Sequence, residues 1–389
     1  MKEVVLDDGS FHGLAIYPRL VIGPNVTEIQ VTVIRSAFLW ANATAVLRKA
    51  SLLNLTSFTL SSIKKSSSPK EAESLELLST LRSVRKLSFS EPVFLSSRAI
   101  SMISTFPMLE NFQLLVTEEE MENCIPFVEN NFPAITHLAI SSETMNACRL
   151  MLLQLQSGML RSLTLTRATS GAHWSIGWLL VTLHECNLAS RLESLHIRNR
   201  PWIQFILDLE NSTSASDEFF NMDGHAFEYL SPFKQLHDLH LESFSIDMDD
   251  NNLMKLAKSL PQLRSLVFRE AEELYEVPKC TFTGMQHLIQ FCPKLERLTL
   301  RVDGRQIPIF ADQPDGEYPS GLHLTTLNLR DSPILDADGV ASYLTMLFPV
   351  LVDFFATYHQ EKEEEEEEDV DPYRAIWLKV EELMDCFIP

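Results

Sequence analysis

The stretch CPKLERLTLR, residues 292–301, combines a cysteine, a proline and three leucines at fixed spacing. A similar stretch, LPQLRSLVFR, occupies residues 260–269. Under one interpretation Cys292 and Arg301 belong to a reactive site, and under the other the stretch is one copy of a structural unit. Because both stretches share the spacing apolar-x-x-apolar-x-apolar, a repeated unit is the better starting hypothesis.

The same spacing recurs along nearly the whole chain of 389 residues, in twelve copies. Successive copies begin 25 to 32 residues apart, except for one step of 44 residues, and this regularity is not expected by chance. The copies are VTEIQV at Val26, LTSFTL at Leu55, VRKLSF at Val84, LENFQL at Leu109, ITHLAI at Ile135, LRSLTL at Leu160, LESLHI at Leu192, LHDLHL at Leu236, LRSLVF at Leu263, LERLTL at Leu295, LTTLNL at Leu324 and the weaker LVDFFA at Leu351.

Each copy predicts one short strand, because its last two apolar positions alternate and so point to one face. The segments between copies carry helical spacing, and three of them end just before a proline, at Pro107, Pro261 and Pro293. Strand, turn and helix at a period of about 28 residues predict an α/β leucine-rich-repeat horseshoe solenoid, with a curved parallel sheet and outer helices. Cys292 then becomes a small core residue, and a reactive role for it is disfavoured.

Composition excludes several partner classes. The formal net charge is −21, so phosphate backbones and anionic membranes should repel the chain, and we expect neither nucleic acid nor membrane as partner. The N-terminus lacks the apolar core of a signal peptide, and the apolar runs are too short to cross a bilayer. The six cysteines are scattered without a C-x-x-C pair, which disfavours a zinc site. We therefore expect a cytoplasmic or nuclear protein without metal or cofactor.

Three regions are predicted: a repeat array over residues 1–357, an acidic disordered segment over 358–371 and a capping helix over 372–389. The acidic run EKEEEEEED, Glu361–Asp369, would be either a solvated spacer or a segment that binds a basic partner. The final helix would cover the last repeat or dock another protein. We expect a mobile loop over Ser61–Ser74, a projecting insertion from Asn211, and no regular helix over Asp303–Gly321.

The phrases CPKLERLTLR, LPQLRSLVFR, FPMLENFQL and FPAITHLAI resemble the repeats of F-box leucine-rich-repeat proteins, a ribonuclease-inhibitor-like family, especially its divergent fungal members. The resemblance covers residues 26–357. It implies substrate reception in a cullin–RING ubiquitin ligase, where an F-box holds the cullin adaptor and the repeats hold the target. Only 25 residues precede the first copy and no F-box is visible, so the chain is either an F-box relative without its first domain or a stand-alone repeat protein.

The ninth repeat position, Asn or Cys in regular families, is here Asp303, Ser332, Ala271 or Arg200. An asparagine ladder, which would satisfy the backbone of the turns, is therefore missing. We expect these turns to be satisfied locally and irregularly.

The polar positions of each strand should face the concave side, and they concentrate positive charge there. Six cations stand against four acids on this face, a net charge of +2 on a chain of −21. Neighbouring strands lie about 4.8 Å apart, so Arg269, Arg301 and Arg330 should form a ladder suited to carboxylate or phosphate groups. The alternative is pairing with acids of the same solenoid: Glu242, Glu270, Asp303 and Asp331. The candidate partner-binding residues are Arg198, Arg269, Arg297, Arg301, Arg330, His196 and His240.

Catalysis finds little support, because no G-x-S-x-G, H-E-x-x-H, P-loop or dinucleotide motif occurs. The sequence favours recognition of a protein partner, with an acidic or phosphorylated segment, by the concave face. An F-box-like substrate receptor is the first interpretation. A scaffold without a ubiquitin link and a small-GTPase regulator remain open, the latter because some nuclear-transport activators pair such repeats with an acidic tail. An enzyme is the least favoured class.

Overall fold

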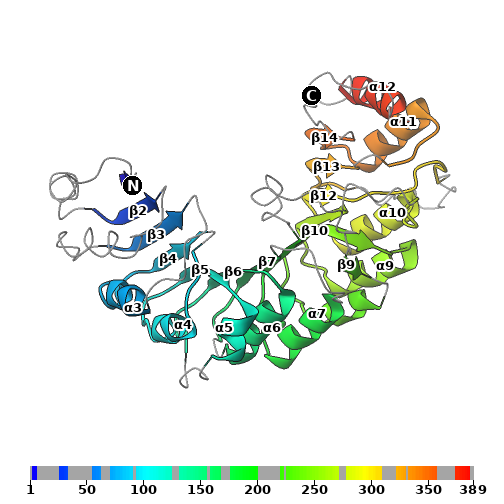
Figure 1. Cartoon of the computed structure of the whole chain (residues 1–389). Helices are drawn as coiled ribbons and strands as arrows, with labels where there is room; N and C mark the ends of the chain where they lie inside the picture. The colour runs from blue at the N-terminus through cyan, green and yellow to red at the C-terminus, as the bar shows by residue number, and fades with distance from the viewer. Residues whose placement is uncertain are drawn as a thin grey trace, which may run out of the picture. The chain divides into compact units, whose positions relative to one another are not determined.

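The computed structural model describes residues 2–6, 26–33, 55–62, 71–90, 93–124, 131–155, 158–167, 176–199, 220–222, 225–270, 277–308, 321–329, 332–356 and 373–385. They belong to two compact units, one formed by residues 1–171 and 200–215 and the other by residues 172–199 and 216–389. Both units are built from strands that run parallel to their neighbours, with helices on one face of the strands (Figure 1).

The first unit contains seven strands that pair in the order of the chain. They are β1 Lys2–Leu6, β2 Glu28–Val33, β3 Ser57–Ser62, β4 Lys86–Phe89, β5 Asn111–Val116, β6 His137–Ser142 and β7 Ser162–Arg167. Its helices are α3 Glu71–Ser79, α4 Ser97–Ile103, α5 Glu118–Glu122 and α6 Met145–Gln154.

The second unit, which carries the candidate site, repeats this design. Its strands are β8 Ser194–Asn199, β9 Phe220–Met222, β10 Asp238–Ile246, β11 Ser265–Glu270, β12 Arg297–Thr299, β13 Thr326–Asn328 and β14 Asp353–Phe355. Its helices are α7 Ile176–Glu185, the 3-10 helix η1 Ala226–Leu230, α9 Asp250–Ser259, α10 Phe282–Phe291, α11 Ala337–Leu347 and α12 Arg374–Asp385. The α/β leucine-rich-repeat fold predicted from the sequence is confirmed.

The core of each unit is a ladder of apolar side chains between the sheet and the helices. Strand pairing aligns the same repeat position across neighbours, so Leu239 pairs with Leu195 on one side and Leu266 on the other. These leucines are fully buried, and each contributes about 1.5–3 kcal/mol relative to an exposed side chain. A single strand of three to six residues could not bury its apolar face alone, which is why the units require stacking.

All twelve predicted strands are present, and helices α9 and α10 end just before Pro261 and Pro293, as predicted. Ser96 caps α4 by accepting from the backbone N–H of Ala99, and Asp249 caps α9 in the same way. Cys292 ends α10 and is buried, with Sγ 3.4 Å from the carbonyl oxygen of Leu260. Burial raises the pKa of its thiol to about 12, so Cys292 is a core residue, as predicted.

The sequence missed two strands and misplaced one helix start. Strand β1 was overlooked although MKEVVL carries the repeat spacing at Met1, Val4 and Leu6, whereas β9 lacks the first apolar position. Helix α3 begins at Glu71, so the end of the loop expected over Ser61–Ser74 is helical, and Ser74 is buried. Glutamate and alanine are good helix formers and follow Pro69 here, which is the signal that the loop prediction overlooked. The acidic run, the insertion from Asn211 to 219 and residues 309–320 lie outside the described residues.

Carboxylates at helix starts take over part of the role of the missing asparagine ladder. Glu118, the first residue of α5, accepts from Thr144 Oγ1, the cap of α6, at 2.6 Å. Asp250, the first residue of α9, accepts from the N–H and Oγ1 of Thr281, the cap of α10, at 2.7 and 2.6 Å. We call these contacts carboxylate bridges. They satisfy helix termini between repeats, not only within them as expected.

Ser332, at the ninth repeat position, also satisfies the backbone between repeats. Its Oγ accepts from the N–H of Val302 at 2.9 Å, and it is fully buried. A serine therefore performs here what an asparagine does in regular repeats.

Gly284 of α10 leaves the space that the Asp250 bridge needs, because a Cβ at this position would lie 2.5 Å from Asp250 Oδ1. We expect Gly284→Ala to displace the carboxylate and to lower the free energy of unfolding by about 1 kcal/mol, the lost hydrogen bonds outweighing the better helix propensity of alanine. In an Asp250→Ala background the same change should become neutral or stabilising by up to about 1 kcal/mol. Urea unfolding of the four chains measures this cycle, and equal effects in both backgrounds would refute the packing explanation.

The C-terminal helix α12 packs on α11 through Trp377, Val380 and Met384, which are buried. Trp377 Nε1 donates to the carbonyl oxygen of Ser332 at 2.7 Å, and its ring lies 6.0 Å from that of Phe354 on β14. The helix thus joins the last helix and the last strand of the second unit. Within the described part of the chain, none of the helices combines the length and apolar character needed to span a bilayer.

Candidate functional site

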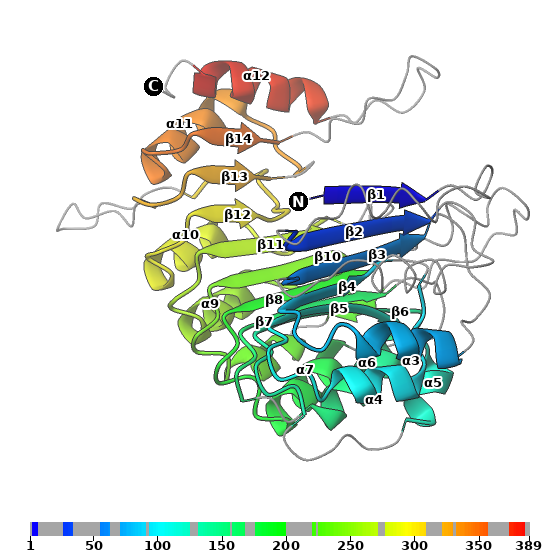
Figure 2. The ribbon, with the colours of Figure 1, turned by 90° about the vertical axis from the view of Figure 1, so that its left-hand side faces the viewer.

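The strands of the second unit have helices on one face, and we call the other face the helix-free face (Figure 2). The described candidates on β8 and β10 alternate with buried residues such as Leu195 and Leu239, which places them on this face. Strand pairing arranges its side chains in three rows. Asp238 pairs with Ser194 and Ser265 in the first row, and His240 pairs with His196 in the second. In the third row, Glu242 pairs with Arg198 on β8 and Arg269 on β11.

Glu242 is a nearly buried carboxylate between two guanidinium groups. Its Oε2 lies 3.3 Å from Nε of Arg198, and its Oε1 lies 3.8 Å from a terminal nitrogen of Arg269. The Glu242 side chain is 9% exposed, whereas those of Arg198 and Arg269 are 33% and 49% exposed. The acid is therefore held inside the surface while both arginines remain accessible.

His196 and His240 form a parallel stack beside this ion pair. Their ring centroids are 4.0 Å apart and their planes differ by 5°. Nε2 of His240 is hydrogen-bonded to Ser265 Oγ at 2.9 Å, which fixes the orientation of the ring.

The surroundings of both imidazoles lower their pKa and so favour the neutral form. Burial lowers the pKa of His240 to about 3, with further contributions from His196 and from Arg198, Arg297 and Arg269. Burial and Arg198 also lower the pKa of His196, although Asp238 and Glu242 oppose that shift. Two neutral rings can stack this closely, whereas two imidazolium ions would repel each other.

Arg297 of β12 is exposed and lies in the first row, opposite Ser265 and Thr326. Together these residues form what we call the arginine–histidine cluster: Arg198, Arg269, Arg297, His196, His240, Asp238 and Glu242. With neutral imidazoles, three guanidinium groups stand against two carboxylates, a net charge of +1 on a chain whose net charge is −21.

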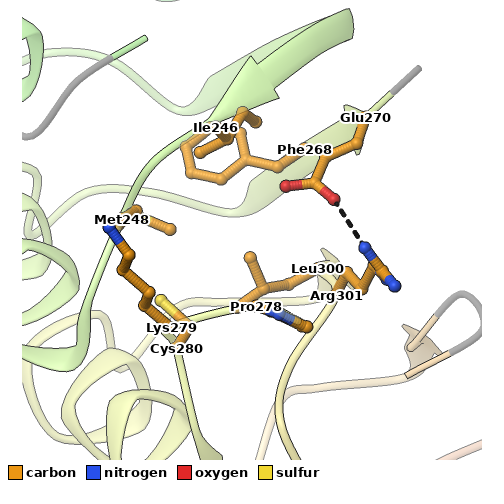
Figure 3. A pocket seen from close by; sticks show the side chains of 9 residues that line it. All are labelled: Ile246, Met248, Phe268, Glu270, Pro278, Lys279, Cys280, Leu300 and Arg301. Carbon is orange, nitrogen blue, oxygen red and sulfur yellow. Dashed lines mark hydrogen bonds and ion pairs between the residues drawn. The ribbon is translucent and has the colours of Figure 1, made fainter. Parts of the chain in front are cut away.

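Arg301 lies two residues beyond the end of β12 and pairs with an acid of the same unit, so the ladder of Arg269, Arg301 and Arg330 stays a prediction. Its guanidinium group is 3.5 Å from Glu270 Oε2, and both side chains are 19% exposed. They line a recess with Lys279 and Cys280 (Figure 3). The recess holds about 10 Å³, about the space of one water molecule, so it offers no room for a small-molecule ligand.

Arg330 and Asp331 lie outside the described residues. Of the other candidates, Arg198, Arg269, Arg297, His196 and His240 belong to the cluster, and Arg301 pairs with Glu270 in the recess. Intramolecular pairing, the alternative weighed from the sequence, applies to Glu242 and Glu270, while Asp303 pairs with Arg305.

Sequence reasoning missed the histidine stack and the position of Glu242 between two arginines. The signal was present, because His196 and His240 occupy the same position in LESLHI and LHDLHL, the seventh and eighth copies. Aligning the copies residue by residue, instead of counting charges over the whole face, would have paired them.

Comparison with known proteins adds little. No family model matches the chain, and no curated relative matches it. Among solved structures, the crystal structure of the Rad7 and Elc1 complex in yeast is similar, with 12% sequence identity, a TM-score of 0.42, and coverage of 86% of this chain and 87% of that chain. A likeness this distant carries no functional conclusion.

Proposed function

We propose that this protein is a recognition module that binds a protein partner through the arginine–histidine cluster on the helix-free face of its second unit. The observation that carries the proposal is the cluster itself. Arg198 and Arg269, both more than 30% exposed at the side chain, flank one nearly buried acid, and Arg297 is exposed on the next strand. A negatively charged segment of a partner would meet complementary charge only locally, because the chain as a whole is acidic.

The resemblance of the repeats to F-box leucine-rich-repeat proteins supports a narrower proposal, in which the bound partner is a substrate presented to a cullin–RING ubiquitin ligase. Recovery of the cullin adaptor with the full-length protein would support this role. Recovery of partners without any ubiquitin machinery would instead favour a scaffold.

The double variant Arg269→Gln/Arg297→Gln tests the binding surface. We expect it to reduce recovery of the main partner at least about tenfold in affinity purification, since each hydrogen bond to a charged group contributes about 1.5–3 kcal/mol. Lys255→Gln/Arg264→Gln is the matched control, because these two cations of the same unit are 54% exposed and lie outside the cluster. Equal recovery with both variants, at unchanged melting temperature, would exclude the cluster as the binding surface.

A further inference from the structure

The arginines of the cluster keep hydrogen-bonding capacity for a ligand. Each guanidinium group has five N–H donors. The contacts of Arg198 and Arg269 with Glu242, at 3.3 and 3.8 Å, are longer than the roughly 2.7–2.9 Å of a tight charge-assisted hydrogen bond. Among the described residues, Nε of Arg198 is buried without a hydrogen-bond partner. The two contacts with Glu242 therefore leave N–H donors of Arg198 and Arg269 for a ligand.

A carboxylate and a phosphate dianion would differ in whether the cluster must take up a proton to become neutral. A carboxylate would bring the cluster's net charge of +1 to zero. A phosphate dianion would bring it to −1, and one proton on the histidine pair would restore neutrality. Phosphate also has three terminal oxygens, which allow it to contact Arg198, Arg269 and one imidazole N–H together.

We propose, on the basis of the proposed function, that the cluster receives the phosphate group of a phosphorylated partner segment and that one imidazole of the His196–His240 stack takes up a proton from solvent as the phosphate binds. The proton goes to His196, because Asp238 and Glu242 face it and stabilise its charged form. Only one ring is protonated, since two imidazolium ions whose centroids are 4.0 Å apart would repel each other.

The pH dependence follows from the charges that face the stack: Arg198 on β8, Asp238 and Glu242 on β10, Arg269 on β11 and Arg297 on β12. In the free chain burial and the arginines lower the pKa of both histidines. A bound dianion cancels the arginine field and raises the pKa of His196. Binding then consumes a proton, so affinity for a dianion must increase as pH falls between the bound and the free pKa.

Sulfate is the best first probe, because it stays a dianion between pH 8 and pH 6, whereas a phosphomonoester gains a proton near pH 6. Histidine side-chain NMR of the full-length protein, with sodium sulfate replacing sodium chloride at constant ionic strength, follows the two rings directly. We expect sulfate and inorganic phosphate to shift the signals of His196 and His240. Sulfate affinity should rise by up to about tenfold per pH unit as pH falls.

Three variants test whether the NMR shifts arise at the cluster and whether the two histidines cause the pH dependence. Arg269→Gln/Arg297→Gln should lose the shifts and Lys255→Gln/Arg264→Gln should retain them. His196→Gln/His240→Gln should abolish the pH dependence of whatever sulfate affinity remains, followed by calorimetry. Absence of any shift with either anion would overturn the site, and anion binding that does not vary with pH would overturn the proton uptake.

Phosphatase treatment of the lysate separates this inference from the proposed function. Loss of the partner from wild-type purifications after treatment is the expected result. If the arginine variant loses the partner but phosphatase treatment has no effect, the phosphate site is wrong and the recognition surface stands. If neither changes recovery, both proposals fail.

Discussion

Replacing Trp377 by alanine is expected to lower the free energy of unfolding by about 3–5 kcal/mol, the range for a large buried aromatic residue. Trp377 is fully buried, packs near Phe354 and donates to the carbonyl oxygen of Ser332. Its removal would detach α12 from α11, leave that carbonyl group without its indole donor and open the end of the apolar core. Chemical denaturation followed by circular dichroism measures the loss.

Trp178→Ala is the matched control, because Trp178 belongs to the same unit but is 65% exposed. Its replacement should change stability by no more than about 0.5 kcal/mol. Hydrogen exchange should show selective loss of protection in α11 and β14 for the Trp377 variant. Similar losses for both tryptophans would mean that α12 does not stabilise the end of the array in the way its contacts indicate.

Glu242→Gln is expected to increase the affinity for sulfate about tenfold or more, because it removes the carboxylate that competes with the ligand for Arg198 and Arg269. The net charge of the cluster rises from +1 to +2 while the shape of the side chain is retained. A cost of about 1 kcal/mol in stability should accompany the gain, since the two arginines are partly exposed and lose only a screened ion pair. Titration of both chains with sulfate, followed by histidine NMR, measures the affinity.

Glu270→Gln provides the comparison for this gain. Like Glu242→Gln, this substitution removes one negative charge. The carboxylate that it removes lies on β11 and pairs with Arg301 in the recess. Sulfate affinity should change by less than about twofold. Glu270 makes its ion pair with Arg301, so its replacement frees neither Arg198 nor Arg269, and solvent screens its remaining effect on the arginine–histidine cluster. An equal gain with both variants would show that overall charge, not release of Arg198 and Arg269, controls anion binding.

The strands could be predicted because the spacing of apolar residues within each copy is enough to indicate a strand with one buried face. In LERLTL, the spacing of Leu295, Leu298 and Leu300 determines which side chains enter the core, and these residues are buried. Strand β9 could not be predicted in this way, because it is three residues long and pairs only with the end of β10. Its conformation depends on a neighbour and not on its own pattern.

The candidate site was predicted less completely, for a related reason. Sequence position shows which side chains share a face, but not which of two nearby acids an arginine selects. Arg301 follows β12, and its guanidinium group pairs with Glu270 at the end of β11. Such choices depend on local packing and burial, which charge counts do not contain.

The carboxylate bridges have a consequence for how the array can change over time. In a solenoid, stability is roughly a sum of terms within repeats and between nearest neighbours. Asp250 and Thr281 belong to different repeats, and the start of α10 in one repeat donates to a carboxylate of the other. Loss or duplication of a single repeat would leave one of them unmatched, whereas exchange of both repeats as a pair would not. We therefore expect recombination to be tolerated on either side of this pair of repeats but not between its members.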